Sequence, residues 1–404
     1  MVAAVSESCR DYTRRFMASG ASTVSRTLVA PTAGAATRLV SLDVFRGLTM
    51  AAMVIVNNPG DWDTVYPPLL HAPWHGWTPT DLIFPFFLFI AGVSVTLSRK
   101  VERPGRIVMR AAIILGLGLF LSGFPHFDVA RWRIPGVLQR IAVCYLVAAG
   151  AYYMVRKDPR SAAQPLRAAG VLAGLAAVLA LGYWAVLMLI APPGGVAGDL
   201  TPEGNLGAHL DRALMDGHLW KPRWDPEGLL STIPAIATTL LGCVAGLWIK
   251  AAETPHRRAA GLAIAGIVGI IVGTAWGFVF PINKSLWTSS YVLFTAGAAA
   301  LMLALFDWVI DIKGWRRWTG PLVVLGVNAL ALYVASGLLV ETMGMIKVTG
   351  PDGAAISLSR YIYLHYFAPF AAPKNASLAY ALAHLAILYV LLAWMYRRRI
   401  FLRA

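Results

Sequence analysis

Long runs of apolar residues, separated by short polar segments, dominate the chain from about residue 40 onward. A helix needs roughly 20 mainly apolar residues to cross the hydrocarbon core of a bilayer. Ten segments approach that length, and the first and third are the shortest. The pattern therefore predicts an all-α polytopic integral membrane protein with about ten transmembrane helices, over residues 42–57, 80–98, 107–122, 134–155, 167–191, 229–249, 259–280, 288–310, 322–340 and 378–396.

Basic residues alternate between the loops that join these segments. Alternate loops, together with both chain ends, hold 24 of the 35 Lys and Arg residues, whereas the opposite loops hold 9. Cytoplasmic loops of membrane proteins carry an excess of basic residues. Both termini are therefore predicted to be cytoplasmic, and the even number of crossings agrees with this.

Composition narrows the class of protein further. Of the 404 residues, 58% are hydrophobic and 14% are charged, whereas a soluble domain has about 25% charged residues. This excludes a water-soluble enzyme. The net charge of +15 is set largely by the topology of the loops, so no nucleic-acid partner is predicted. The three cysteines form no readable disulfide framework, because two of them lie inside apolar runs.

Two parts are predicted along the chain. Residues 1–37 mix Ser, Thr, Ala and Arg without an apolar core and are expected to form a flexible cytoplasmic tail. Residues 38–404 form the transmembrane domain, whose long outer loops at 192–228 and 341–374 are expected to be external caps. Gly269, Gly273 and Gly277 recur every four residues, which favours close approach of a neighbouring helix.

The outer loop between the first two segments is the most informative stretch. It contains His71, Trp74 and His75, several carboxylates and no Lys or Arg. Aromatic faces cover the C–H surfaces of sugars and carboxylates bind hydroxyl or amino groups, so the loop suits a sugar acceptor. An interfacial aromatic belt with solvated histidines explains the same composition.

Asp81 ends this loop and also allows two interpretations. Thr78, Pro79 and Thr80 before it read as a helix start, where a carboxylate near the amino end is favourable. Alternatively, the carboxylate orients a nearby histidine by accepting a ring N–H.

Two arginines lie inside predicted spans. Arg46 is three residues after Asp43, so an ion pair along the helix is the ordinary explanation. Arg140 follows Gln139 about a turn and a half into its span, where a charged residue is costly and usually faces a cavity or a partner.

Further candidates lie on the outer side, and each has a structural alternative. Asp225 and Glu227 flank Pro226, where Asp225 also suits a helix cap, and Lys284 can extend to the membrane surface. Asn283 precedes Lys284, and Asn328 inside the ninth span can hydrogen-bond between helices. The sequence contains no phosphate-binding glycine motif, zinc-ligand spacing or serine nucleophile motif, so no metal is expected.

Several of these stretches together resemble the heparan-alpha-glucosaminide N-acetyltransferase family, part of the transmembrane acyltransferase superfamily. The similarity runs in order from about residue 38 to 311. The chain resembles bacterial members of the family without the large amino-terminal lumenal domain. The motifs that carry it are SLDVFRG (41–47), MVIVN (53–57), HAPWHGWTPTDLIFP (71–85), RIPGVLQR (133–140), DPEG (225–228) and NKSLW (283–287).

The resemblance implies an enzyme of the bacterial inner membrane that transfers acetyl from cytosolic acetyl-CoA to the amine of a glucosamine on the far side. His71 then matches the catalytic histidine, as general base or as acetyl carrier, and Asn57 and Asp81 match active-site residues. The residues assigned to the acceptor are Trp74, Asp225, Glu227, Asn283 and Lys284.

Acetyl-CoA carries phosphate groups, which cationic side chains would stabilise. The candidates for binding it are Arg46, Arg133, Gln139 and Arg140. The alternative function is an amino-sugar permease, because buried polar residues among ten spans also suit a transporter. The assembly is left open, with a homodimer as one option.

Overall fold

The structure is a computed structural model of the chain, and it describes residues 39–98, 103–350 and 353–402. Within these ranges nine helices are long and apolar enough to cross a membrane, and one bent pair of helices passes the same test when its two members are taken together. The chain is therefore a multi-pass α-helical membrane protein, as predicted. The predicted tail, 1–37, lies outside the described residues, whereas Leu39 and the residues after it form one compact unit.

Proline begins many of the helices, because its missing N–H is not needed in the first turn. Pro104, Pro165, Pro255 and Pro373 each stand at the first helical position. The long helices are α2 (Val40–Asn57), α3 (Ile83–Leu97), α4 (Pro104–Gly123), α5 (Val137–Lys157), α7 (Pro165–Leu189), α9 (Leu229–Ala251), α10 (Pro255–Trp276), α11 (Ser289–Phe306) and α15 (Pro373–Arg397).

Shorter elements extend or connect these spans. The 3-10 turn η4 leads into α3, and the π-helical turn η6 continues α11. The loops that were expected to be caps contain α8, a two-stranded antiparallel hairpin and α14. These elements are η2 (Trp62–Thr64), η3 (Pro67–Leu69), η4 (Pro79–Leu82), α6 (Pro159–Ala163), α8 (Leu206–Met215), η6 (Asp307–Ile312), α12 (Gly320–Val327), α13 (Ala329–Met345), β1 (Lys347–Thr349), β2 (Ala355–Ser357) and α14 (Leu358–Tyr366).

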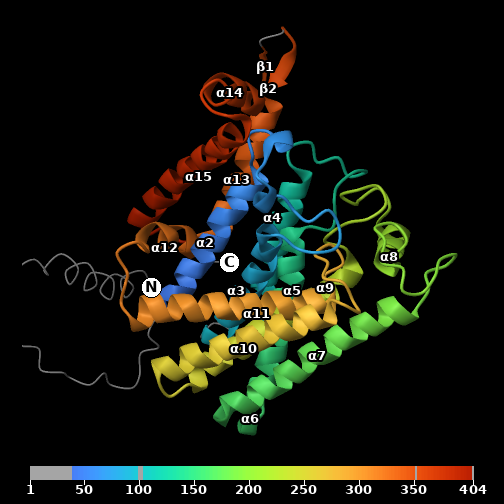
Figure 1. Cartoon of the computed structure of the whole chain (residues 1–404), viewed down its shortest axis with the longest axis vertical. Helices are drawn as coiled ribbons and strands as arrows, with labels where there is room; N and C mark the ends of the chain where they lie inside the picture. The colour runs from blue at the N-terminus through green and yellow to red at the C-terminus, as the bar shows by residue number, and fades with distance from the viewer. Residues whose placement is uncertain (1–38, 99–102, 351–352, 403–404) are drawn as a thin grey trace, which may run out of the picture. The chain divides into compact units, whose positions relative to one another are not determined.

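The spans differ in how much of their surface the protein covers. The most apolar windows of α9 and of α3 with η4 are 67% and 61% buried, whereas those of α4 and α10 are only 22% buried. Figure 1 shows α3, α5 and α9 in the middle of the compact unit, with α10 and α11 side by side along one edge. Lipid is thus expected to contact mainly α4, α7 and α10, and the interior lies around α3, α5 and α9.

Small residues let α10 approach α11 closely, as the glycine spacing predicts. A Cβ atom at Gly269 would lie 2.9 Å from the Cα of Gly297, and one at Gly273 would lie 2.4 Å from the backbone nitrogen of Phe294. Gly277 differs, because it is the residue after the last turn of α10. A Cβ atom there would meet only the end of α10 and the side chain of Ile282. The predicted packing role is therefore confirmed for two of the three glycines.

The ninth predicted segment, 322–340, is not one continuous helix, so that part of the prediction is wrong. α12 and α13 meet at an angle of 80° at Asn328, whose backbone is not helical. The Asn328 amide donates to the carbonyl of Ile400 at 3.0 Å, and its oxygen accepts from the backbone N–H of Leu402 at 3.2 Å. The side chain therefore holds the segment after α15 rather than bridging two spans.

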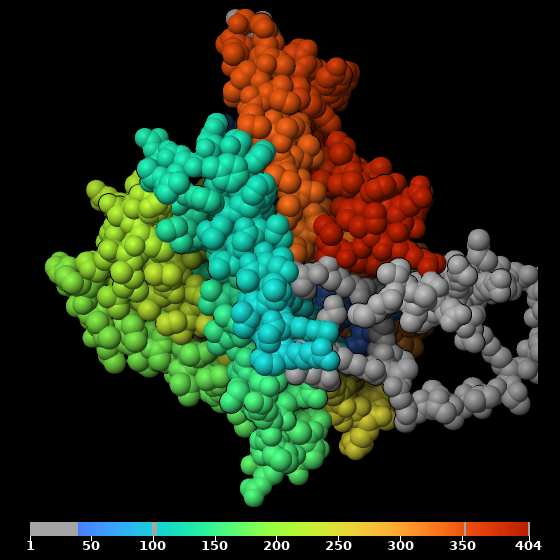
Figure 2. Space-filling model, turned by 180° about the vertical axis from the view of Figure 1, so that it is seen from behind, coloured from blue at the N-terminus to red at the C-terminus, as the bar shows by residue number. Residues whose placement is uncertain are grey.

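The loops at 58–82, 124–136, 190–228, 277–288 and 346–372 belong to the side predicted to be external, which we call the outer face. The opposite side is the inner face. Figure 2 shows α13 beside α4 and α15 on the rear of the unit, with the hairpin protruding beyond the end of α13. The α14 helix packs against α13 and α15 near this end. The outer face therefore carries more ordered structure than the apolar pattern indicates.

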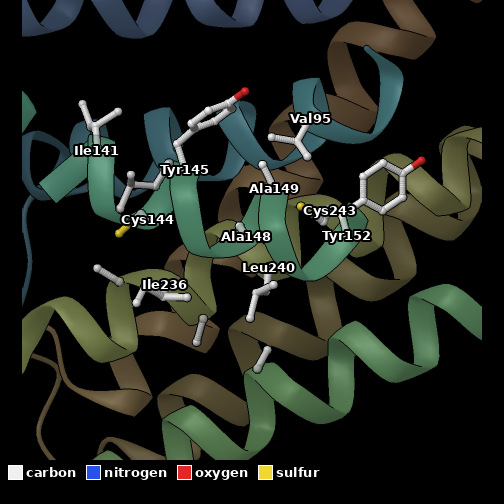
Figure 3. Close-up of a cluster of buried hydrophobic side chains, with 14 of the residues drawn as sticks. Val95, Ile141, Cys144, Tyr145, Ala148, Ala149, Tyr152, Ile236, Leu240 and Cys243 are labelled. Atoms are coloured by element: carbon white, nitrogen blue, oxygen red, sulfur yellow. The ribbon is translucent and has the colours of Figure 1, made fainter. Parts of the chain in front are cut away.

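Two faces of α5 have different surroundings. Figure 3 shows Cys144 on the side toward Ile236 and Leu240 of α9, whereas Ile141 and Tyr145 point away from α9. Cys144 is buried and free, as is Cys243, so the predicted absence of a disulfide framework holds for the two cysteines that the structure describes.

Candidate active site

His71 and Asp81 form a direct pair on the outer face. The Nδ1 atom of His71 lies 2.7 Å from Oδ1 of Asp81. The Asp81 side chain is 1% exposed, whereas the His71 side chain is 48% exposed. One ring nitrogen is thus fixed by a buried carboxylate, and the ring itself stands at the surface where a substrate can approach.

Asp81 also caps the turn that leads into α3. Its Oδ2 atom accepts hydrogen bonds from the backbone N–H groups of Ala72 and Thr78, at 3.0 and 2.9 Å. Asp81 and Thr78 form a reciprocal capping box around η4. The two interpretations drawn from the sequence are therefore both correct, since one oxygen caps the turn and the other contacts the histidine.

Lys284 completes this cluster from a loop more than 200 residues later in the chain. Its Nζ atom lies 3.1 Å from Nδ1 and 3.0 Å from Nε2 of His71, and 3.9 Å from Oδ1 of Asp81. Burial lowers the pKa of Lys284, and the carboxylates of Glu227 and Asp81 oppose that shift. The cluster therefore joins an imidazole, a carboxylate and an amine.

Asn283 ties the two loops of this cluster together. The Asn283 side chain is fully buried, donates to the carbonyl of Trp74 at 2.9 Å and accepts from the N–H of Leu286 at 2.8 Å. The N–H of Gly76 donates to the carbonyl of Ile282 at 2.8 Å. Since its amide is already engaged with the protein, Asn283 acts on the shape of the site, and its assignment to the acceptor stays a prediction.

Trp74 extends from the His71 loop to the 190–228 loop. Its indole N–H donates to the carbonyl of Leu200 at 2.8 Å, and its ring meets Trp224 edge to face at 5.2 Å. The two rings line a small cavity of about 20 Å³ together with the buried carboxylates of Asp211 and Asp225. Trp74 therefore links the His71 loop to the 190–228 loop, and its assignment to the acceptor stays a prediction.

Asp225 and Glu227 form an ion-pair network with Arg133. The guanidinium of Arg133 contacts both oxygens of Asp225, at 3.0 and 2.7 Å, and Oε2 of Glu227 at 2.6 Å. Its planar group also stacks over Trp220. This arrangement places Arg133 on the outer face and links the loop before α5 to the loop before α9, so its role in acetyl-CoA binding stays a prediction that no contact here supports.

Arg140 is buried to 2% exposure beneath the outer face. It donates to the carbonyl of Gly228 at 3.0 Å and to the hydroxyl of Ser231, and it lies over the ring of Trp287. Its Nε and Nη1 atoms have no hydrogen-bond partner among the described residues. A charged group in a span does face polar partners, as predicted, although these belong to the start of α9.

Gln139 and Asn57 lie apart from the cluster. Gln139 donates to the hydroxyl of Ser122 at 3.1 Å and packs against Gly118 and Gly136. Asn57 is the last residue of α2 and is exposed, and in the described part of the chain no hydrogen bond joins it to His71. Their assignments to acetyl-CoA and to the active site stay predictions.

A second polar site lies in the half of the protein nearer the inner face. A cavity of about 330 Å³, which we call the inner cavity, is lined by α2, α3, α4, α5 and the bend between α12 and α13. Arg46 lines it, paired with Asp43 at 3.1 Å as the spacing predicts, and also donates to Ser94 at 2.7 Å. Arg46 is therefore both an ion-pair partner and a cavity residue.

Arg110 is a second cationic residue of this cavity, and the candidates drawn from the sequence do not include it. Its guanidinium lies 4.8 Å from the centre of the Tyr145 ring, and its Nε atom is buried without a hydrogen-bond partner in the described residues. The basic cluster at 99–110 is typical of a cytoplasmic loop, and the pattern does not indicate that one member, Arg110, lines a cavity. Its place one and a half turns into α4 was the available clue.

No group of three or more His, Cys, Asp or Glu side chains that could hold a metal ion occurs in residues 39–98, 103–350 and 353–402. The His71 cluster offers one imidazole and one carboxylate, with an amine as third member. An imidazole beside a carboxylate and an amine can transfer protons and stabilise charge.

Fold and site together define a polytopic membrane protein with a His–Asp–Lys cluster on one face and a cationic cavity toward the other. The family model described as heparan-alpha-glucosaminide N-acetyltransferase, catalytic, matches residues 38–193. The chain belongs to the heparan-alpha-glucosaminide N-acetyltransferase family.

Two relatives extend the similarity beyond the matched region. Heparan-alpha-glucosaminide N-acetyltransferase of Mus musculus is 32% identical over 363 residues, which cover 75% of this chain and 54% of the mouse protein. The protein of that name from Homo sapiens is 32% identical over 353 residues, which cover 74% of this chain and 52% of the human protein. The chain thus spans about half the length of the curated relatives it matches.

Proposed function

We propose that this protein is a transmembrane acetyltransferase of the bacterial inner membrane. It takes acetyl from acetyl-CoA bound in the inner cavity and delivers it to the amine of a glucosamine or related amino sugar at the outer face. The observation that carries the proposal is the His71–Asp81 pair, because it presents an oriented imidazole at an exposed site in a member of this family.

The inner cavity supports the assignment of the donor. Arg46 and Arg110 bring two positive charges to its lining, and charge-assisted contacts to phosphate oxygens are among the stronger hydrogen bonds. Its volume of about 330 Å³ is at the lower end of small-molecule sites, so it would hold part of acetyl-CoA, with the remainder toward the inner surface. The unpartnered Nε atom of Arg110 is a donor that a phosphate could satisfy.

The outer cluster supports the chemistry. A glucosamine amine attacks a thioester in its neutral form, and the new bond makes its nitrogen positive, so that a base must remove a proton from it. An imidazole can accept that proton. With Nδ1 held by the Asp81 carboxylate, Nε2 of His71 is the nitrogen available for that step. The same nitrogen could instead carry the acetyl group as a covalent intermediate.

The helix α3 connects the two sites. Phe87, Ile90 and Ser94 line the inner cavity, and Asp81 lies just before the first turn of α3. A helix rises about 1.5 Å per residue, so Phe87 and Asp81 are separated by roughly 9 Å along the helix axis. The acyl arm of the donor therefore has a short distance to cover between the end of the cavity nearer the outer face and His71.

A transporter of amino sugars is the alternative function. The break between α12 and α13 at Asn328 lines the inner cavity, and interrupted helices are typical of transporter binding sites. In that case an unmodified amino sugar would cross the membrane, and acetyl-CoA would not be consumed.

The test is incubation of the purified protein in detergent with radiolabelled acetyl-CoA and glucosamine, followed by separation of N-acetylglucosamine. The proposal expects product from the wild type and none above background from His71→Ala. It also expects Arg110→Gln to raise the KM for acetyl-CoA about tenfold, with little change in the KM for glucosamine. A wild type that forms no acetylated product while vesicles containing it accumulate glucosamine would favour the transporter.

A further inference from the structure

Lys284 occupies an unusual position relative to His71. Its Nζ atom lies at nearly equal distances, 3.1 and 3.0 Å, from the two ring nitrogens. An atom in the plane of the ring could not be so close to both nitrogens without overlapping the carbon between them. Nζ therefore lies over a face of the ring, which leaves the in-plane direction of Nε2 open to a substrate.

A purely structural role as counter-ion of Asp81 does not account for this position. The Asp81 carboxylate already has three close partners, which are the ring of His71 and the N–H groups of Ala72 and Thr78, at 2.7 to 3.0 Å. Nζ of Lys284 is farther away, at 3.9 Å. Since Asp81 is satisfied without it, the closer partner of Lys284 is the reacting histidine.

The backbone around Lys284 is held in place on both sides. The carbonyl of Lys284 accepts from the N–H of Trp287 at 3.1 Å, and the carbonyl of Asn283 accepts from the N–H of Thr288 at 3.1 Å. Asn283 and Trp287 are buried to 0% and 1% exposure. Groups held by their surroundings before the reaction need no reorganisation during it, which is the condition for effective charge stabilisation.

We propose that Lys284 is a catalytic residue of the acetyl transfer, whose ammonium donates a hydrogen bond to the acetyl carbonyl oxygen as that oxygen becomes negative. The inference rests on the proposed function. Any atom that reacts with Nε2 of His71 lies about 3 Å from it. The acetyl oxygen is then within reach of Nζ, which is itself 3.0 Å from Nε2.

The step balances as follows. The neutral amine of the sugar forms a bond to the thioester carbon, and the electron pair of the C=O bond moves to the oxygen beside Lys284. His71 takes the proton that the amine releases. Return of the electron pair breaks the C–S bond, and the departing CoA sulfur receives that proton, so that an amine and a thioester become an amide and a thiol. If His71 carries the acetyl group instead, the same oxygen becomes negative in each half of the reaction.

Asn57 is a weaker candidate for this role. It is exposed at the end of α2, and no described contact orients it toward His71. A charged donor is also about twice as strong a hydrogen-bond partner as a neutral amide. Lys284 is therefore the better-placed donor.

The experiment exchanges the amine of Lys284 chemically within one folded preparation. Lys284→Cys is made in a Cys9→Ser background, where the remaining Cys144 and Cys243 are buried. The protein is treated with 2-bromoethylamine, which restores a primary amine, or with (2-bromoethyl)trimethylammonium, which restores the positive charge without any N–H. Acetyl transfer from acetyl-CoA to glucosamine is then measured, and Lys347→Cys in the outer hairpin is treated identically as the control.

We expect Lys284→Cys to lower kcat about 10²- to 10³-fold with little change in the KM for glucosamine. The primary amine should restore at least a tenth of the wild-type kcat, and the trimethylammonium should restore none. Equal rescue by both reagents, or a raised KM with unchanged kcat, would overturn the inference. Lys284→Arg, which keeps N–H donors, should retain more activity than Lys284→Cys, and the opposite order would also overturn it.

Different results would reject the proposed function and the role of Lys284. An inactive wild type would reject the proposed function, and the inference with it. An active wild type whose kcat does not depend on the group at position 284 would reject the inference alone. Melting temperatures of the variants before and after alkylation identify any loss of activity that is due to unfolding.

Discussion

Replacing Asp81 with asparagine should reverse the proton arrangement of His71 while leaving the fold intact. The Oδ2 atom of Asp81 accepts from two backbone N–H groups, those of Ala72 and Thr78. In Asp81→Asn the amide oxygen must take that position, because an NH₂ group there would face two donors. The NH₂ group then lies where Oδ1 now contacts Nδ1 of His71 at 2.7 Å.

The magnitude follows from this geometry. An NH₂ group donates, so Nδ1 of His71 must accept and the ring proton moves to Nε2. That nitrogen can then neither take a proton nor attack a carbonyl carbon. Loss of a charge-assisted hydrogen bond costs about 1.5–3 kcal/mol, and the wrong tautomer of a catalytic histidine lowers kcat by up to about 10⁴-fold in another enzyme. We expect kcat of Asp81→Asn to fall about 10²- to 10⁴-fold.

The assay is the initial rate of labelled N-acetylglucosamine formation, measured with the melting temperature of the same preparation. Asp63→Asn is the matched control, because Asp63 is an exposed carboxylate of the same loop and should show wild-type rates. The melting temperature of Asp81→Asn should stay near that of the wild type, because the capping contacts are kept. An Asp81→Asn protein that keeps more than about a third of the wild-type kcat would refute the reasoning.

Three further predictions test the fold and its electrostatics. Gly269→Leu should lower the melting temperature, because its Cβ would lie 2.9 Å from α11, whereas Gly174→Leu on the open face of α7 should not; equal melting temperatures would contradict the packing. Burial raises the pKa of Asp211 to about 6. The free energy of unfolding of the wild type therefore falls as pH rises from about 4 to 6, and above pH 6 the total loss is roughly 3 kcal/mol. Asp211→Asn should therefore melt higher than the wild type at pH 7.5 and similarly at pH 4, and the same difference at both pH values would exclude this cause. In a background without native cysteines, Asp63→Cys should react with an impermeant thiol reagent added outside cells, and Gln164→Cys should not. Both positions are exposed, and the predicted topology places them on opposite sides of the membrane. The reverse labelling pattern would invert the predicted orientation.

Most of the fold could be predicted because bilayer thickness sets the length of an apolar run. Nine of the ten predicted segments correspond to single helices, and the i, i+3 pair of Asp43 and Arg46 is present as helical spacing requires. The break at Asn328 could not be seen, because residues 322–340 are apolar on both sides of it. At the break, the Asn328 side chain contacts Ile400, which is 72 residues away in the sequence.

The site was predictable where its chemistry is local in sequence. His71 and Asp81 are ten residues apart in one loop, and both suggested roles of Asp81 occur together. Lys284 was assigned to the acceptor, whereas the structure brings it against His71 across 213 residues of sequence. Arg110 was hidden within a basic cluster, since charge counting records where a cation is encoded and not where its side chain points.

The most direct test of the account uses sealed vesicles that contain the protein in one orientation. Radiolabelled acetyl-CoA is supplied only on the side of the inner face, and glucosamine only on the side of the outer face. The account predicts labelled N-acetylglucosamine in the glucosamine compartment, free CoA in the donor compartment, and no product with His71→Ala. Product that forms only when acetyl-CoA and glucosamine share a compartment would contradict transfer across the membrane.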